Sequence, residues 1–304
     1  MLSTLFRCME KASLPLYASI AAAVVNTGLN FVLIFGKLGF PAMGAKGVAV
    51  ATVVAQLINF FIMLVLYFQC NKPFTEKDKN VPQVAGYHWG QYAGILLPLL
   101  VCEFMWSLGE NVYAAIYGLM GTDTSAAMTL INPLQGLMIG ALCGLSQAAS
   151  VIIGKKLGVG EYEEAFQASK KLLSYGFIGS TVLSVVILVI SPYYVHIFQV
   201  EEHVKILTKQ ILLTYALVAP FKVENMILGG GILRSGGKTN YVMAIDLIGT
   251  WVFGVPLGLL AAFVWKLSIP YVYFILSLEE CVRFVISFVV LWRRKWMVTI
   301  SSLF

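Results

Sequence analysis

Residues 124–153 read TSAAMTLINPLQGLMIGALCGLSQAASVII, a run without a single Asp, Glu, Lys or Arg. A helix of this length is long enough to cross the roughly 30 Å hydrocarbon core of a bilayer. Three further runs, at 14–36, 47–68 and 172–195, also lack charged residues. These four runs predict transmembrane helices, and the rest of the chain has to be interpreted in a membrane.

The composition agrees with a membrane protein. Of the 304 residues, 59% are hydrophobic and only 12% are charged, whereas soluble domains carry about 25% charged residues. A water-soluble fold is therefore excluded. The five cysteines are scattered and odd in number, so they support neither a disulfide framework nor a CxxC metal site. The net charge of +6 comes without a basic stripe interleaved with aromatic residues, so no nucleic acid partner is predicted.

Four more apolar runs contain ionisable residues and bring the predicted spans to eight; they lie near 92–121, 210–233, 239–265 and 267–292. Cytoplasmic loops of membrane proteins hold an excess of Lys and Arg. With both termini inside, 14 of the 21 basic residues fall on the cytoplasmic side and five on the outer side. The sequence thus predicts an all-α polytopic helical bundle in the cell (inner or plasma) membrane, with both termini cytoplasmic.

The polar segment 154–171 predicts a short amphipathic helix at the inner surface.

A weak internal repeat predicts two lobes. RCMEK at 7–11 and RSGGK at 234–238 both lead directly into a span, and repeated halves are common in transporters. We expect the last two helices of an N-terminal lobe at 1–68, a cytoplasmic inter-lobe linker at 69–90, a six-helix C-terminal lobe at 91–296 and a tail at 297–304. The first lobe has two predicted spans and the second lobe has six. If the lobes are equivalent, four helices are missing at the amino end. The alternative is that eight spans are natural and a second copy completes the protein.

Charged side chains within predicted spans are candidates for function, because each costs about 2.5–3.5 kcal/mol at the bilayer centre. Glu103 and Glu110 lie seven residues apart, about two helical turns, and share a face with Trp106 and Tyr113. Carboxylates and aromatic faces both attract organic cations, although the aromatic residues could instead only pack against neighbouring helices. Asp246 has no opposite charge within four residues on its helix. We predict that these five residues bind substrate or ion.

The remaining intramembrane charges predict structural ion pairs. Glu279 and Glu280 precede Arg283 by four and three residues, so all three can pair on one helix face. Lys222 is the candidate partner of Asp246 across the bundle. If the two do not pair, Asp246 is left to carry a proton.

Small residues predict close helix packing in the 124–153 run. Gly136, Gly140 and Gly144 recur every four residues, which lets another helix approach closely. Pro133 interrupts the same run and predicts a hinge.

Three segments resemble those of the multidrug and toxic compound extrusion (MATE) transporters: GLSQAASVIIGKKLGVGEYEEA at 144–165, ILRSGGKTNY at 232–241 and NTGLNFVLIFG at 26–36. The resemblance covers essentially the whole chain and implies that the first four helices of the family are absent from it. It implies two six-helix bundles facing a central cavity, and export of organic cations driven by proton or sodium entry. CEFMWSLG at 102–109 resembles a helix whose acidic residue often takes part in coupling, which points to Glu103. Lys238 stands where such sequences often have an acidic residue.

The predicted function is secondary active efflux of organic cations or drugs by antiport with protons or sodium, through alternating access between two lobes. Proton and cation would compete for one carboxylate, such as that of Glu103. The predicted partners are a small organic cation, membrane lipid, and the missing helices or a second copy; no cofactor or metal is expected. An enzyme is disfavoured, because all three histidines lie outside the spans. A lipid or polysaccharide-precursor flippase and a non-transporting fragment are the alternatives.

Overall fold

The computed structural model describes residues 2–9, 11–37, 39–70, 89–237 and 239–297. The chain divides into two compact units, Met1–Tyr87 and His88–Phe304. Lys238, most of the predicted linker 69–90 and the tail from 298 onward lie outside the described residues.

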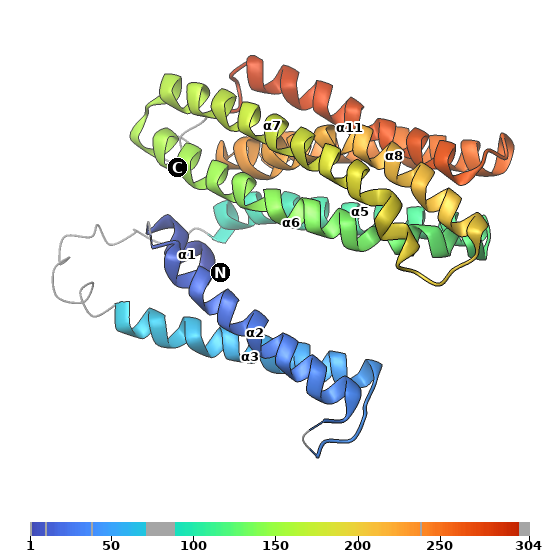
Figure 1. The fold of residues 1–304 in the computed structure, drawn as a ribbon. Helices are drawn as coiled ribbons and strands as arrows, with labels where there is room; N and C mark the ends of the chain where they lie inside the picture. Colours follow the sequence, from blue (N-terminus) through green and yellow to red (C-terminus); the bar gives the residue numbers. More distant parts are fainter. Residues whose placement is uncertain (1, 10, 38, 71–88, 238, 298–304) are drawn as a thin grey trace. The chain divides into compact units, whose positions relative to one another are not determined.

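The first unit is a helical hairpin (Figure 1). It consists of α1 (Leu2–Cys8), α2 (Ser13–Phe35) and α3 (Ala45–Cys70). Helix α2 ends at Gly36, whose φ of 64° is in the left-handed region that glycine adopts without steric cost. A Cβ at Gly36 would come within 2.8 Å of the Ala42 backbone nitrogen. The glycine that closes the NTGLNFVLIFG segment is therefore required by the tight return of the chain toward α3.

The second unit is a bundle of long helices (Figure 1). Its first part consists of α5 (Trp89–Leu119), α6 (Thr122–Val159), α7 (Tyr162–His196) and α8 (Glu202–Asn225). Helix α8 continues into η1 (Met226–Leu233), a segment with the wider hydrogen bonding of a π-helix. The next span alternates between the two helix types, as α9 (Thr239–Leu247), η2 (Ile248–Gly254), α10 (Val255–Leu259) and η3 (Leu260–Val264). Helix α11 (Ile269–Trp292) completes the described part of the bundle.

Six described helical segments are long and apolar enough to cross a membrane, so the chain is a multi-pass membrane protein: Ser13–Phe35, Ala45–Gln69, Thr122–Val159, Tyr162–His196, Glu202–Leu233 and Thr239–Val264. The other two predicted spans correspond to α5 and α11, which have 31 and 24 residues. Helix α11 carries two glutamates and an arginine in its middle, which lowers its apolar character.

The predicted amphipathic helix at 154–171 is not a separate element. Residues 154–159 complete the 38-residue helix α6, and α7 begins at Tyr162. Gly160, with a φ of 86°, forms the connection between them. Both helices therefore continue past the apolar runs that predicted them.

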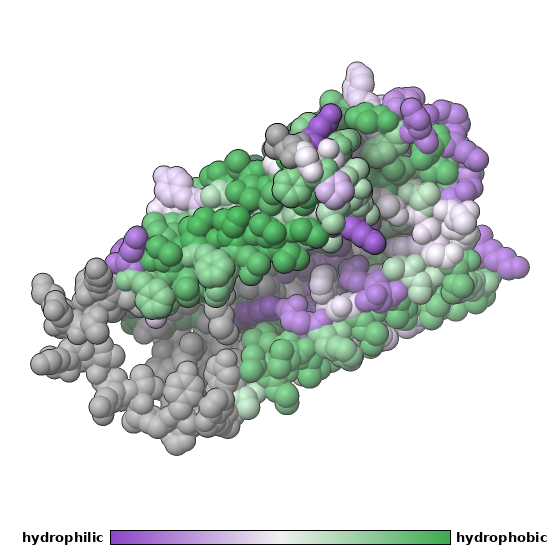
Figure 2. Space-filling model, turned by 90° about the horizontal axis from the view of Figure 1, so that it is seen from below, coloured by the Kyte–Doolittle hydropathy of each residue, from purple (hydrophilic) through white to green (hydrophobic). Residues whose placement is uncertain are grey.

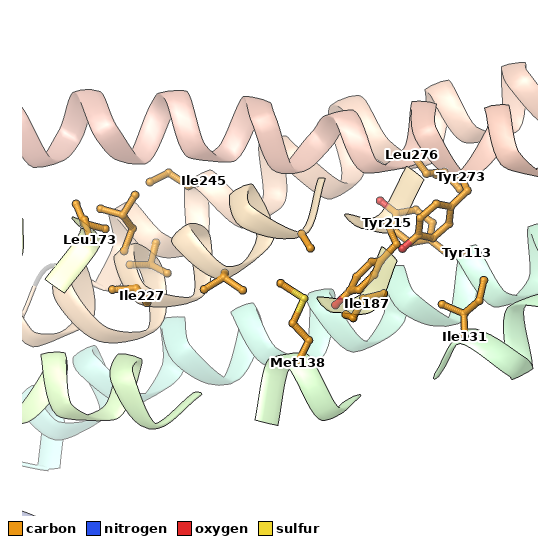
Figure 3. Packing of buried hydrophobic residues seen from close by; sticks show 14 of the residues in the cluster. Tyr113, Ile131, Met138, Leu173, Ile187, Tyr215, Ile227, Ile245, Tyr273 and Leu276 are labelled. Carbon is orange, nitrogen blue, oxygen red and sulfur yellow. The ribbon is translucent and has the colours of Figure 1, made fainter. Parts of the chain in front are cut away.

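Helix α8 and η1 lie at the centre of the second unit. In the Glu202–Leu233 segment, 61% of the apolar stretch is buried, compared with 22% in α6. Apolar side chains from α5, α6, α7 and α11 pack around it (Figure 3). Figure 2 shows hydrophobic side chains in long bands along the helices, as expected for surfaces that face lipid tails.

Within the second unit, the predicted glycine ridge does not pack against another described helix. Gly136, Gly140 and Gly144 are exposed, and a Cβ on any of them would meet no described atom within 4 Å. The buried face of α6 instead contains Ile131 and Met138. Pro133 lies inside α6 on the exposed side.

Close backbone approach occurs at other glycines. A Cβ at Gly249 would overlap the Arg283 side chain, and one at Gly254 would overlap the Tyr113 hydroxyl and the Glu279 carboxylate. These two glycines allow the backbone of η2 to lie directly against the side chains of Arg283, Tyr113 and Glu279.

Candidate functional site

Two cavities of similar size lie within the described part of the second unit. The first, called the tyrosine cavity here, has a volume of about 310 Å³ and includes among its lining residues Glu110, Tyr113, Tyr117, Asn132, Gln135, Tyr215, Lys222, Tyr273, Glu279 and Glu280. The second, called the arginine cavity, has a volume of about 300 Å³ and includes Cys102, Glu103, Trp106, Lys222, Arg234, Asp246, Glu280 and Arg283. Lys222 and Glu280 border both.

Buried tyrosines from three helices form the first cavity. Tyr113 of α5, Tyr215 of α8 and Tyr273 of α11 are each at most 8% exposed, and Figure 3 shows their rings gathered at one place. The Gln135 side-chain amide donates a hydrogen bond to the Tyr273 hydroxyl at 2.9 Å. The Tyr117 ring lies 6.5 Å from that of Tyr273, centroid to centroid. The cavity thus presents aromatic faces with fixed hydroxyl groups.

A buried guanidinium connects this cavity to its surroundings. Arg283 Nη2 lies 3.2 Å from Glu279 Oε1, and Arg283 Nη1 lies 3.8 Å from Glu280 Oε2. Arg283 also donates to the Thr250 hydroxyl in η2. All three charged side chains are at most 10% exposed. The pairing expected from sequence spacing is therefore formed along one face of α11.

Both glutamates have a second partner. The Tyr113 hydroxyl donates to Glu279 Oε2, and the Asn225 amide donates to Glu280 Oε2 at 2.9 Å. These bonds tie α5 and α8 to α11. Because a buried charge is costly unless it is paired and hydrogen-bonded, this network explains how two carboxylates are held inside the bundle.

The expected ion pair between Lys222 and Asp246 is not formed. Asp246 Oδ2 instead accepts a hydrogen bond from the Cys102 thiol at 2.9 Å. Within the described part of the chain, no carboxylate oxygen lies within 4.0 Å of the Lys222 ammonium. The physical reason is that Asp246 faces α5, where the thiol is available as a donor.

Glu103 is neither buried nor uncompensated, contrary to the expectation. Its Oε1 lies 2.8 Å from Arg234 Nη2, and its side chain is 55% exposed. Trp106 lines the same cavity and is 47% exposed. Glu110 is exposed and lines the tyrosine cavity, where Tyr113 also lies. The acidic and aromatic stripe of α5 is thus divided between two cavities, with Asp246 on the side of Glu103.

Several lining residues were not predicted. Tyr215, Tyr273 and Gln135 are uncharged and lie within apolar runs, so only their polar atoms in a membrane span could have marked them. Arg234 lies one residue beyond the predicted span 210–233, so it is not among the charges expected within the membrane. Among the described residues, no group of three or more His, Cys, Asp or Glu side chains is arranged to hold a metal ion.

Comparisons with known proteins add a family relationship. A family model described as MatE matches residues 98–260. The chain is 25% identical over 264 residues to the "Probable multidrug resistance protein NorM" of Pasteurella multocida, covering 83% of this chain and 56% of the relative. It is 25% identical over 269 residues to human "Multidrug and toxin extrusion protein 2", covering 87% of this chain and 43% of the relative.

Among solved structures, the fold is similar to that of "MATE transporter ClbM in complex with Rb+", with a TM-score of 0.74 and 21% sequence identity. The match covers 98% of this chain and 64% of that one. At this identity the likeness concerns the fold alone. The chain spans less than two thirds of the length of these relatives.

Proposed function

The chain belongs to the MatE family, whose members are transporters rather than enzymes, and on this premise we propose that it serves in secondary active efflux of organic cations or drugs. The driving force is antiport with protons or sodium, and no cofactor takes part. Helices α5 and α11 are also spans, which brings the total to eight. The protein lies in the cell membrane with both termini on the cytoplasmic side.

The tyrosine cavity is the observation that carries this proposal. Its volume of about 310 Å³ is within the range of about 300–1,000 Å³ typical of small-molecule sites. Tyrosine faces attract cations by about 0.5–2 kcal/mol each, and three carboxylates line the same space. Glu279 and Glu280 are engaged with Arg283, whereas Glu110 has no ion pair among the described residues. Glu110 is therefore the carboxylate that receives the cationic group.

Coupling is assigned to the pair formed by Glu103 and Arg234. This ion pair joins α5 to the residue that follows η1. A proton or a sodium ion on the Glu103 carboxylate removes the attraction that holds Arg234. Release of this contact allows the helices around the arginine cavity to rearrange, which is the local event that alternating access requires.

The arginine cavity does not favour an anionic cargo such as a lipid-linked sugar precursor. Three basic residues line it, and so do three acidic ones: Glu103, Asp246 and Glu280. Its formal charge is therefore balanced, and no observation supports the flippase alternative.

Cation binding by the purified chain in lipid nanodiscs tests the site. We expect tetraphenylphosphonium to bind, and Glu110→Gln to weaken its binding about tenfold, which corresponds to about 1.4 kcal/mol, because the substitution removes the negative charge that faces the cation. The matched control is Glu202→Gln, which removes a carboxylate at the exposed start of α8. Equal binding by wild type and the Glu110 variant would contradict the proposed site.

Efflux is measured separately, in proteoliposomes loaded with a fluorescent cation under an imposed proton or sodium gradient. Gradient-dependent export that Glu103→Gln abolishes supports the antiport. Export at a rate that depends on neither the proton gradient nor the sodium gradient would contradict the proposed antiport.

A further inference from the structure

Lys222 lies between the two cavities. It is part of α8 within the most buried apolar segment of the chain, and its own side chain is half-buried. It lines both the tyrosine cavity and the arginine cavity. The Lys222 side chain therefore borders both spaces.

Apart from Glu110, the acidic groups that line the two cavities with Lys222 are already bound to other residues. Arg283 pairs with both glutamates of α11, Arg234 pairs with Glu103, and the Cys102 thiol donates to Asp246. Of the three described basic residues that line the cavities, Lys222 alone has no carboxylate within 4.0 Å. Ion pairs hold the two arginines, and no such pair holds Lys222 among the described residues.

A buried ammonium without a fixed partner needs attraction from several directions. Isolated buried charge is strongly unfavourable, and a lysine carries its charge on a flexible four-carbon stem with three rotatable donors. Glu110 and the tyrosines line the space on one side of it, and Asp246 lines the space on the other side. Glu280 borders both sides, so a position in either cavity keeps one common counter-charge.

We propose that the Lys222 ammonium occupies the tyrosine cavity when the cavity is empty of substrate and moves to the arginine cavity when an organic cation binds. Lys222 is thus a tethered competitor of the substrate. The inference rests on the function proposed for the tyrosine cavity and adds the rule by which it selects its ligands. A bound monovalent cation replaces one positive charge with another, so the charge of the cavity is unchanged.

The first test is the affinity of the purified chain for tetraphenylphosphonium. Lys222→Met keeps most of the side-chain volume and removes the competing charge. We expect it to bind the probe about tenfold more tightly than wild type, which corresponds to 1.4 kcal/mol. Lys222→Arg, which retains the charge, is expected not to show the gain. Tetraphenylmethane, a neutral probe of similar shape, should bind the wild type and Lys222→Met equally.

The second test separates displacement from simple repulsion and needs no substitution. Reaction of wild-type lysines with acetic anhydride is followed by mass spectrometry, with and without saturating tetraphenylphosphonium. The reactivity of Lys222 is expected to change on binding, while that of the exposed Lys266 stays constant. Unchanged reactivity of Lys222 would show a fixed ammonium and overturn the proposal, even if Lys222→Met binds more tightly.

The outcomes also distinguish the two proposals. If wild type binds the cation through Glu110 but Lys222→Met gains no affinity, only the role of Lys222 is wrong. If neither protein binds the cation, the function of the tyrosine cavity fails, and the role of Lys222 fails with it.

Discussion

Arg283→Met is expected to cause the largest loss of stability among single substitutions in the buried network of Glu279, Glu280 and Arg283. It removes the guanidinium that lies 3.2 Å from Glu279 and 3.8 Å from Glu280 and leaves both carboxylates buried. Removing one partner of a buried ion pair costs about 3–5 kcal/mol. For a unit of about 200 residues, each kcal/mol lowers the melting temperature by about 2–4 °C. We therefore expect a decrease of about 6–20 °C for the purified protein.

The assay is thermal unfolding in detergent followed by tryptophan fluorescence. Arg293→Met removes the same type of charge just beyond the end of α11 and should shift the melting temperature little. Adding Glu279→Gln to Arg283→Met should recover part of the loss, because one of the uncompensated charges is then removed. An Arg283→Met protein as stable as the Arg293→Met protein would refute the reasoning that the guanidinium neutralises the two carboxylates.

Three further predictions concern single side chains. Gly254→Ala places a methyl group against a hydroxyl and a carboxylate of the tyrosine cavity and should destabilise the protein by about 1–3 kcal/mol; Gly136→Ala, whose Cβ meets nothing within 4 Å, should be neutral or stabilising in the same melting assay. Tyr273→Phe removes the hydrogen bond from Gln135 and should cost about 1 kcal/mol, while tetraphenylphosphonium affinity changes little because the aromatic face remains. Glu103→Gln breaks a half-exposed ion pair, so stability should change by less than about 1 kcal/mol while gradient-driven efflux in proteoliposomes is lost; a large loss of stability with intact efflux would reverse the assignment.

Local features of the fold could be predicted from the sequence. The apolar runs give the positions of the spans, because a helix that crosses lipid must be apolar over about 20 residues. The spacing of Glu279 and Glu280 from Arg283 gives the pairing on α11, since residues three and four apart are neighbours on a helix. The apolar runs do not predict where α6 ends and α7 begins. The turns at these helix ends are polar, so they carry no apolar signal.

Contacts between distant segments could not be predicted. Glu103 and Arg234 are 131 residues apart, and Cys102 and Asp246 are 144 residues apart. No periodicity in a single sequence shows which helices contact each other. A carboxylate that is paired with a distant residue therefore looks the same in the sequence as one that has no partner. The glycine spacing on α6 likewise identifies a smooth face without showing whether another helix covers it.

Glu280 borders the tyrosine cavity and the arginine cavity alike, and this shared wall makes the two compartments thermodynamically dependent on each other. A cation that binds near this carboxylate in one cavity lowers the affinity of the other cavity for a second cation. If a drug occupies one cavity and a driving ion the other, as proposed above, linkage requires the effect to be reciprocal. The factor by which the drug lowers the affinity for the ion then equals the factor by which the ion lowers the affinity for the drug.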